Sequence, residues 1–265
     1  MMDGPDQKPE TVIRVRDLVT RFGTHTVHEG LDLDVRRGEI IGVVGGSGTG
    51  KSVLLRAIVG LLTPQEGRIE VLGQDVGRTT EDEYRRLRRR WGVMFQDGAL
   101  FSSLTVQGNV EAPMREQTGL SPELRRTLAD IKVRMVGLPD SAHAKYPAEL
   151  SGGMRKRAGF ARAIALDPEI VFLDEPTAGL DPIGAAAFDT LIRQLQAALG
   201  LTVFLVTHDL DSLHAICDRI AVLAERRVLA VGTMSEMLDI DHPWVREYFH
   251  GPRARAVAPS GQAKD

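Results

Sequence analysis

The stretch EIIGVVGGSGTGKSVLLRAIVGLL at residues 39–62 decides the expected fold. It begins with an unbroken run of apolar, mostly β-branched residues, which is typical of a strand buried on both faces. A glycine-rich turn follows, and residues 51–62 then show the apolar spacing of a helix. A buried strand that enters a helix through such a turn predicts a parallel α/β sheet with an anion-binding site at the helix N-terminus.

The turn itself, GGSGTGKS, matches the phosphate-loop pattern G-x-x-x-x-G-K-[ST] at Gly45, Gly50, Lys51 and Ser52. Its glycines let backbone N–H groups wrap phosphates without Cβ clashes. We expect Lys51 to reach the β- and γ-phosphates of a nucleotide and the Ser52 hydroxyl to bind Mg²⁺. The Lys-Ser ending and the flanking strand and helix disfavour a glycine-rich connection without a ligand. The predicted nucleotide contacts in the loop are Gly45, Gly46, Ser47, Gly48, Thr49, Gly50, Lys51 and Ser52.

Strand and helix patterns alternate along most of the chain. Period-two segments near the start predict a small antiparallel β subdomain, and later buried strands separated by helices predict the α/β core. From about residue 98 to 160 helical spacing replaces the strand signals, which predicts an inserted α-helical subdomain. We expect one domain over residues 11–250. The ends, 1–10 and 251–265, are rich in Pro, Gly and charge and are expected to be disordered.

An acidic pair ends the apolar run IVFLDE. Asp174 and Glu175 follow a predicted buried strand, and the carboxyl ends of parallel strands face the ligand crevice of such sheets. Asp174 is expected to hold Mg²⁺, which prefers oxygen ligands and keeps several waters. Glu175 is expected to polarise the attacking water. Each carboxylate alone could be a solvated strand end, but the phosphate loop favours the functional interpretation.

Two further polar residues follow predicted strands. Gln96 ends WGVMFQ and His208 ends LTVFLVTH, so both should lie along the same sheet edge as Asp174. A Gln can ligate Mg²⁺ or orient water, and a His can contact a γ-phosphate during phosphoryl transfer. Taken alone, each residue is more often structural than functional. The seven histidines show no zinc-like spacing.

Composition and charge narrow the class of protein. Hydrophobic residues make up 43% and charged residues 26%, the net charge is −3, and a single cysteine, Cys217, excludes an internal disulfide framework. No run approaches the roughly 18 apolar residues of a membrane helix, and the start lacks the apolar region of a secretory signal. The arginines of RRLRRR follow three acidic residues and have no interleaved aromatics, which favours a solvated helix face over nucleic-acid binding.

The motifs together resemble the ATPases of ABC transporters. The phosphate loop, Gln96, LSGGM at residues 150–154, IVFLDE, AGLD and His208 occur in that family's order over nearly the whole folded chain. The resemblance implies a P-loop NTPase core of the RecA-like type that binds ATP and Mg²⁺ and hydrolyses ATP. It also implies a head-to-tail dimer with two ATP molecules between the copies.

The resemblance also assigns roles by position. Phe22 is similar to the aromatic residue that stacks on adenine, Glu175 to the catalytic glutamate, and His208 to the switch histidine. Gln96 resembles the residue that joins Mg²⁺ and the attacking water to the membrane partner. The residues that resemble the signature loop and the cross-subunit loop, which serve the ATP of the other copy, are Leu150, Ser151, Gly152, Gly153, Met154 and Asp181.

Two positions depart from the commonest family pattern. Met154 stands where many members have Gln, and we expect it to tune the dimer contact. Val53 stands where many have Thr or Ser, which leaves only its backbone N–H for the α-phosphate. Neither departure removes a reacting group, so hydrolysis is still expected.

Longer stretches narrow the resemblance further. GGSGTGKSVLLR, FQDGALFSSLTVQGNV and DHPWVREYF are similar to the ATPases of MCE-type, or Mla, lipid transport systems. Such systems pair the ATPase with an inner-membrane permease and a periplasmic MCE-domain lipid-binding protein, and a small STAS-domain protein binds the ATPase in Mla complexes. The resemblance implies phospholipid transport between the membranes of a Gram-negative bacterium, with this chain on the cytoplasmic face.

Other functions stay open from the sequence. The chain could serve an ABC transporter with another cargo, a soluble ABC ATPase that acts on ribosomes or DNA, or a regulatory nucleotide binder without hydrolysis. One cassette and no coiled-coil heptads count against the soluble ATPase. Intact Lys51, Asp174, Glu175 and His208 count against the non-hydrolysing binder.

Overall fold

The computed structural model describes residues 10–96 and 98–251. Its described part contains a six-stranded core sheet in the order β10-β9-β3-β8-β7-β6. Five of these strands run parallel, and β10 adds an antiparallel edge by a hairpin from β9. The strands are β3 (Ile40–Gly45), β6 (Trp91–Met94), β7 (Ile170–Asp174), β8 (Thr202–Val206), β9 (Arg219–Ala224) and β10 (Arg227–Gly232). Every residue of β3, β7 and β8 is buried, as the continuous apolar runs predict.

A second sheet of the described chain lies beside the core. Its four strands are antiparallel in the order β2-β1-β4-β5. They are β1 (Thr11–Phe22), β2 (His25–Arg36), β4 (Glu66–Val71) and β5 (Gln74–Asp75). This sheet confirms the predicted antiparallel subdomain.

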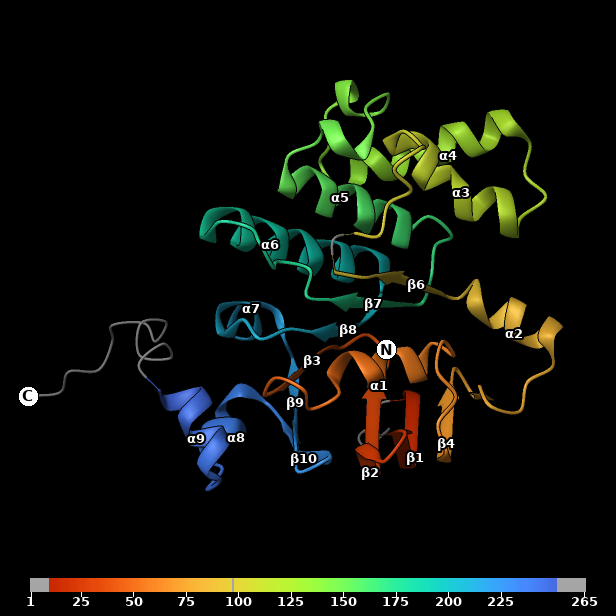
Figure 1. Cartoon of the computed structure of the whole chain (residues 1–265). Coiled ribbons are helices and arrows are strands. Elements are labelled where there is room, and N and C mark those ends of the chain that lie inside the picture. The colour runs from red at the N-terminus through yellow and green to blue at the C-terminus, as the bar shows by residue number, and fades with distance from the viewer. Residues whose placement is uncertain (1–9, 97, 252–265) are drawn as a thin grey trace, which may run out of the picture.

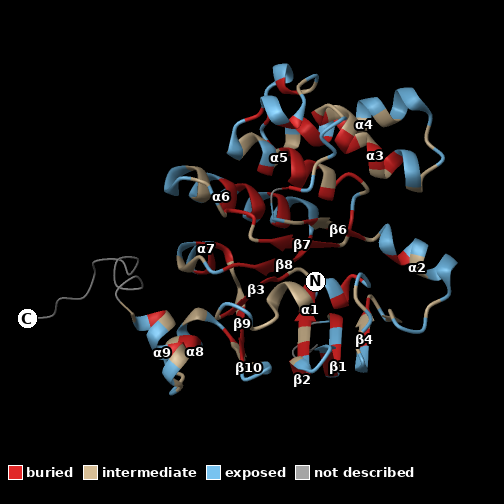
Figure 2. Cartoon of the chain, in the orientation of Figure 1, coloured by how far each residue is buried: buried red, intermediate tan, exposed pale blue. Residues whose placement is uncertain are grey.

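Helix α1 (Lys51–Ile58) lies between the two sheets (Figure 1). Its buried side chains, including Leu54, Leu55 and Ile58, belong to one apolar cluster with residues of both sheets, such as Leu18 and Phe172. Figure 2 shows the resulting buried layer around α1 and the central strands. Because α1 is covered on two sides, its N-terminus and the phosphate loop are held rigidly at the sheet edge.

The other face of the core sheet carries α6 (Pro182–Leu199) and the helical insertion, whose last helix also packs directly on β6 (Figure 1). The insertion comprises α3 (Val106–Gln117), α4 (Pro122–Met135), two short 3₁₀ turns (Asp140–Ala142 and Pro147–Glu149) and α5 (Gly152–Ala163). Ser121 caps α4 by accepting a hydrogen bond from the Leu124 backbone N–H at 3.2 Å. The predicted α/β core with a helical insertion is therefore confirmed.

The remaining helices flank the core. They are α2 (Glu81–Arg88), α7 (Leu210–Ile216), α8 (Met234–Leu238) and α9 (Pro243–His250). Helices α8 and α9 pack on the β9 side of the core sheet through a separate apolar cluster that contains Met237, Val245 and Phe249. The predicted disordered ends, 1–10 and 251–265, lie outside the described residues except for Glu10 and Gly251.

Replacing Gly92 by Ala is expected to destabilise the fold by about 1–3 kcal/mol, because overpacking forces backbone shifts. Gly92 lies in β6, and a Cβ there would sit 1.8 Å from the Ala163 carbonyl oxygen at the end of α5. Urea unfolding measures the change. The control is Gly119→Ala, where a Cβ meets no atom within 4 Å. Equal unfolding midpoints for the two variants would contradict the close packing of α5 on β6.

Candidate functional site

The candidate site lies at the carboxyl edge of the core sheet. Strand β3 ends at Gly45, β7 at Asp174 and β8 at Val206, and the three strands are parallel neighbours. The turns that follow them carry the phosphate loop, Glu175 and His208. The sheet therefore brings together residues that are up to about 160 positions apart in the sequence, at the edge where such folds bind ligands.

The phosphate loop runs from β3 into α1. Gly50 is the N-cap of α1 and adopts a left-handed conformation with φ 93°, which glycine tolerates. The Lys51 ammonium donates hydrogen bonds to the carbonyl oxygens of Gly45 at 2.8 Å and Gly46 at 3.2 Å. Burial lowers the pKa of Lys51, and the charges of Glu175 and Asp174 act in the opposite direction. A cation held this way beside free helix N–H groups suits a phosphate.

Two oxygen groups lie side by side at the start of α1. The Ser52 hydroxyl donates a hydrogen bond to Asp174 Oδ1 at 3.1 Å. Burial raises the pKa of Asp174 above its ordinary value, while the bond from Ser52 opposes the shift. This pair fits Mg²⁺, which takes few protein ligands and keeps waters and phosphate oxygens. The described residues contain no group of three or more His, Cys, Asp or Glu suited to a metal.

Glu175 is held in an unusual backbone conformation beside His208. Its φ is 50°, which a residue with a side chain rarely adopts, and such strain is concentrated at functional sites. Its backbone N–H donates to the Val206 carbonyl at 2.8 Å, and Lys156 Nζ donates to the Glu175 carbonyl at 3.1 Å. Oε2 of Glu175 lies 2.8 Å from His208 Nδ1, with side-chain exposures of 15% and 69%. The carboxylate is thus fixed, while the imidazole faces the open side.

Gln96 and Phe22 lie further out. Gln96 is exposed on the turn that follows β6, and Phe22 ends β1 with 52% of its surface exposed. An exposed ring beside a phosphate site can stack on a nucleotide base. Both roles stay predictions.

The signature residues open the helical insertion's last helix. Ser151 is the N-cap of α5 and accepts a hydrogen bond from the Met154 backbone N–H at 3.3 Å. Asp181 caps α6 in the same way, accepting from Gly184 N–H at 2.9 Å. Leu150 is buried, and Met154 packs against the apolar cluster of the insertion. Each cap explains its residue locally, so the predicted role towards a second copy stays a prediction.

The structure adds site residues that the sequence interpretation missed. Trp244 and Tyr248 of α9 stack with ring centroids 4.8 Å apart. They line an open hollow of about 990 Å³ together with Glu175 and His208. A Cβ on Gly46 would lie 3.4 Å from Trp244 Nε1, so α9 borders the phosphate loop. Lys156 is only 5% exposed. The sequence gives no signal for this burial, because Lys156 lies between two arginines in the basic stretch of α5. Nothing in a single sequence places α9 there.

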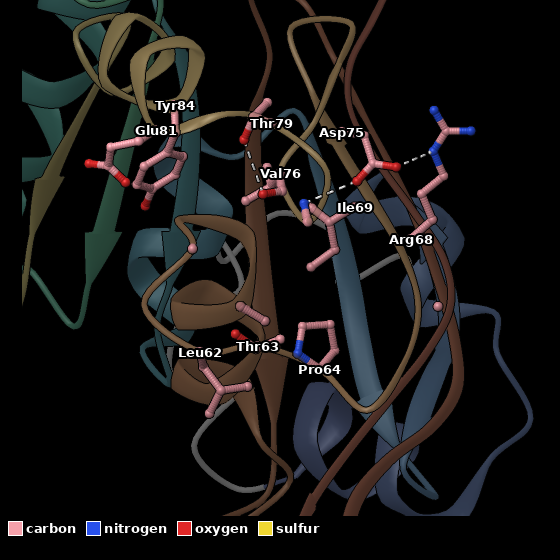
Figure 3. A pocket seen from close by; sticks show the side chains of 14 residues that line it. Leu62, Thr63, Pro64, Arg68, Ile69, Asp75, Val76, Thr79, Glu81 and Tyr84 are labelled. Atoms are coloured by element: carbon pink, nitrogen blue, oxygen red, sulfur yellow. Dashed lines mark hydrogen bonds and ion pairs between the residues drawn. The ribbon is translucent and has the colours of Figure 1, made fainter.

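A smaller hollow lies elsewhere. It has a volume of about 240 Å³, follows the C-terminal end of α1, and is bordered by Leu62, Thr63, Asp75 and Tyr84 (Figure 3). The Tyr84 hydroxyl closes one side by donating to the Val59 carbonyl at 2.7 Å. Since the phosphate loop is at the other end of α1, this hollow does not belong to the candidate nucleotide site.

A phosphate loop that joins the buried parallel strand β3 to helix α1 defines a P-loop nucleotide-binding protein. Residues 28–178 match the family model described as "ABC transporter". The chain belongs to the ABC transporter ATP-binding family and is an ATPase of that family.

Three relatives match most of the chain. It is 39% identical to the intermembrane phospholipid transport system ATP-binding protein MlaF of Haemophilus influenzae, over 91% of both chains. It is 38% identical to the probable ribonucleotide transport ATP-binding protein mkl of Mycobacterium leprae, over 96% of this chain and 72% of that protein. It is 41% identical to the methionine import protein MetN of Rhizobium johnstonii, over 84% of this chain and 61% of that protein. All three relatives are thus named as ATP-binding proteins of transport systems, but the cargoes in their names differ.

Solved structures agree with the fold. A dimeric ATP-binding cassette in a post-hydrolysis state with ADP and phosphate superposes with a TM-score of 0.76 at 30% identity, over 83% of this chain and 98% of that chain. The cbiO1 component of an ABC transporter from Clostridium perfringens superposes with a TM-score of 0.77 at 29% identity, over 92% of both chains. These likenesses confirm the predicted P-loop core.

Proposed function

We propose that this chain is the ATPase of an MCE-type, or Mla, transporter that moves phospholipid between the inner and outer membranes. The observation that carries the proposal is the identity to the Haemophilus phospholipid-transport ATPase, which extends over 91% of both chains. No described helix is long and apolar enough to cross a membrane. A separate permease would supply the path, and the chain would sit on the cytoplasmic face of the inner membrane.

Two copies would close head-to-tail around two ATP molecules. Ser151 is exposed at the N-terminus of α5, where free N–H groups and the helix dipole favour an anion. The γ-phosphate on the phosphate loop of the other copy would be that anion. Gly153 would add a backbone contact, and Asp181 would approach the same interface. ATP binding then stabilises the closed pair because ATP has higher affinity for it than for the separated copies.

Hydrolysis would use the residues at the sheet edge. Ser52 and Asp174 would hold Mg²⁺ together with Gln96, and the bound ion would offset the phosphate charge. Glu175 would accept a proton from the attacking water, and His208 would orient its carboxylate and face the γ-phosphate. The 2.8 Å separation of Glu175 and His208 supports this pairing.

The permease contact is proposed beside Gln96. Phe101 follows closely in the chain, with 47% of its surface exposed, and the Arg162 guanidinium of α5 lies 4.9 Å from its ring centroid. An exposed aromatic residue next to a positive charge suits a protein partner. The helical insertion would carry the closing motion to the permease. The further partners would be an MCE-domain lipid-binding protein and a STAS-domain protein.

Purification from membranes tests the proposal. The tagged chain with Glu175→Gln is purified with ATP from detergent-solubilised membranes of its host, and the bound proteins and lipids are identified by mass spectrometry. We expect a permease, an MCE-domain protein and bound phospholipid. Lys51→Ala is the control that fails to close with ATP. Recovery with a binding protein for an amino acid or nucleotide would contradict the lipid assignment, and recovery with ribosomes would contradict transport.

An ABC importer with another cargo is the second candidate. The relatives named for methionine import and ribonucleotide transport favour it, at 41% and 38% identity. Stimulation of the purified complex's ATPase by methionine or a ribonucleotide, with no response to phospholipid, would select this candidate.

A further inference from the structure

A buried histidine lies directly beneath the phosphate loop. His28 on β2 is 0% exposed, although histidines are seldom so completely buried. Its Nδ1 lies 2.8 Å from the hydroxyl of Thr20 on β1, which is also 0% exposed. The neighbouring strands β1 and β2 place these two residues opposite each other. The ring is therefore fixed by the antiparallel sheet and cannot rotate freely.

The other side of the ring touches the phosphate loop at Gly50. A Cβ on Gly50 would lie 2.4 Å from His28 Nε2 and 2.4 Å from Val27 Cγ1. Gly50 is the N-cap of α1, directly before Lys51, and its carbonyl accepts the first helical bond from Leu54 N–H at 2.8 Å. The imidazole thus meets the loop at the peptide from which the phosphate-facing N–H groups begin.

Complete burial of the ring favours its neutral form. Burial lowers the pKa of His28 to about 4, and the Gly50 backbone acts in the opposite direction. In a neutral imidazole one nitrogen donates and the other accepts. Nε2 has no hydrogen-bond partner of ideal geometry among the described residues. A buried polar atom without a partner lowers the stability of the fold, so a contact at Nε2 is favoured. If Thr20 donates to Nδ1, Nε2 carries the proton, and the Gly50 backbone group that raises the pKa of His28 is then its carbonyl, which accepts from Nε2–H.

We propose that His28 is a positioning residue for nucleotide binding. Held by the Thr20 hydroxyl, its Nε2–H supports the Gly50 carbonyl and fixes the turn in which the N–H groups of Lys51 and Ser52 face the phosphates. The proposal rests on the nucleotide-binding function of the loop. It assigns the antiparallel sheet a part in phosphate binding that is separate from the expected contact of Phe22 with the base.

Matched substitutions separate this role from space filling. His28→Leu keeps an apolar side chain of similar size, and His28→Gln keeps an N–H donor. His25→Leu makes the same change at an exposed position of the same strand. Binding of a fluorescent ATP analogue is titrated with Mg²⁺, the ATPase rate of the assembled complex is measured at saturating ATP, and the melting temperature is measured without nucleotide.

We expect His28→Leu to weaken ATP binding about ten-fold, the size expected for one lost buried hydrogen bond, with a rate at saturating ATP within about two-fold of wild type. His28→Gln should recover most of the affinity, and His25→Leu should bind as wild type. Wild-type affinity in His28→Leu would overturn the proposal. So would equal losses in the Leu and Gln variants, because only the ring volume would then matter. The wild-type chain in the same titration tests the nucleotide-binding function itself. If the wild type does not bind the ATP analogue, that function is wrong, whatever the His28 variants do.

A second measurement does not depend on the stability of His28→Leu. Thr20→Val removes the hydroxyl and keeps the shape, and it should weaken ATP binding several-fold. Nitrogen-15 spectra of the histidine rings, assigned with His28→Gln, should show His28 protonated at Nε2 and neutral from pH 5.5 to 8. A proton on Nδ1, or wild-type affinity in Thr20→Val, would overturn the proposal.

Discussion

Replacing Glu175 by Gln is expected to slow ATP hydrolysis about 100-fold or more while ATP remains bound. The carboxylate is positioned by the left-handed backbone at Glu175 and by His208, whose Nδ1 lies 2.8 Å from Oε2. An amide of the same shape keeps the contact with the imidazole but cannot accept a proton from water. Only the proton transfer is removed, so the rate falls and binding does not.

Phosphate release by the assembled complex at saturating ATP measures the effect. The matched control is Glu247→Gln, the same substitution in α9 on the border of the same hollow. It should leave hydrolysis near the wild-type rate. Wild-type hydrolysis in the Glu175 variant would show that another group accepts the proton, and the geometry of the sheet edge would need a different catalytic assignment.

The core of the fold could be predicted because its signals are local. Residues 40–45 form an unbroken apolar run, the phosphate loop follows, and the acidic pair ends a second such run. Each pattern is complete within a few residues. Parallel strands then place all strand ends at one edge without any knowledge of side-chain contacts. The candidate residues Asp174, Glu175 and His208 follow from that single rule.

The antiparallel strands extend beyond the segments with clean alternation. Apolar and polar residues alternate strictly only at 13–16 and 31–36, whereas β1 runs to Phe22 and β2 begins at His25. The register shifts between Val15 and Leu18, where Asp17 has φ 49° and its N–H donates to Asp32 Oδ1 at 2.8 Å. A bulge adds one residue and reverses the alternation, so the periodicity stops although the pairing continues.

Other parts of the site depend on contacts between distant elements. Trp244 is about 200 residues from Gly46 in the chain, and His28 meets Gly50 only because β2 lies under the loop. No periodicity carries that information. Ser151 and Asp181 show the opposite case, since their cap geometry is local and their proposed partners belong to a second copy. A single chain can place these residues but cannot supply the surface that they face.

Replacing Lys51 by Ala is expected to weaken ATP binding about 100-fold, because two charge-assisted contacts with the phosphates are lost at roughly 1.5 kcal/mol each. This loss differs in kind from that of Glu175→Gln, which keeps ATP. Thermal melting with and without ATP distinguishes the two, since a ligand raises the melting temperature only when it binds the folded chain. ATP should stabilise the wild type and Glu175→Gln, but hardly Lys51→Ala. Lys145→Ala, a lysine of the helical insertion, is the control and should respond as wild type.

The melting temperature without ATP tests whether Lys51 acts on the nucleotide or on the empty loop. Lys51 also bonds the carbonyls of Gly45 and Gly46, so its loss could act by loosening the empty loop. The loop is nevertheless held at both ends. The buried strand β3 precedes it in the chain, and α1, which packs between the two sheets, follows it. We therefore expect the empty variant to melt within a few degrees of wild type, about the effect of 1 kcal/mol in a chain of this size. A large drop without ATP would mean that Lys51 supports the loop itself, and the loss of affinity would then no longer measure its contact with phosphate.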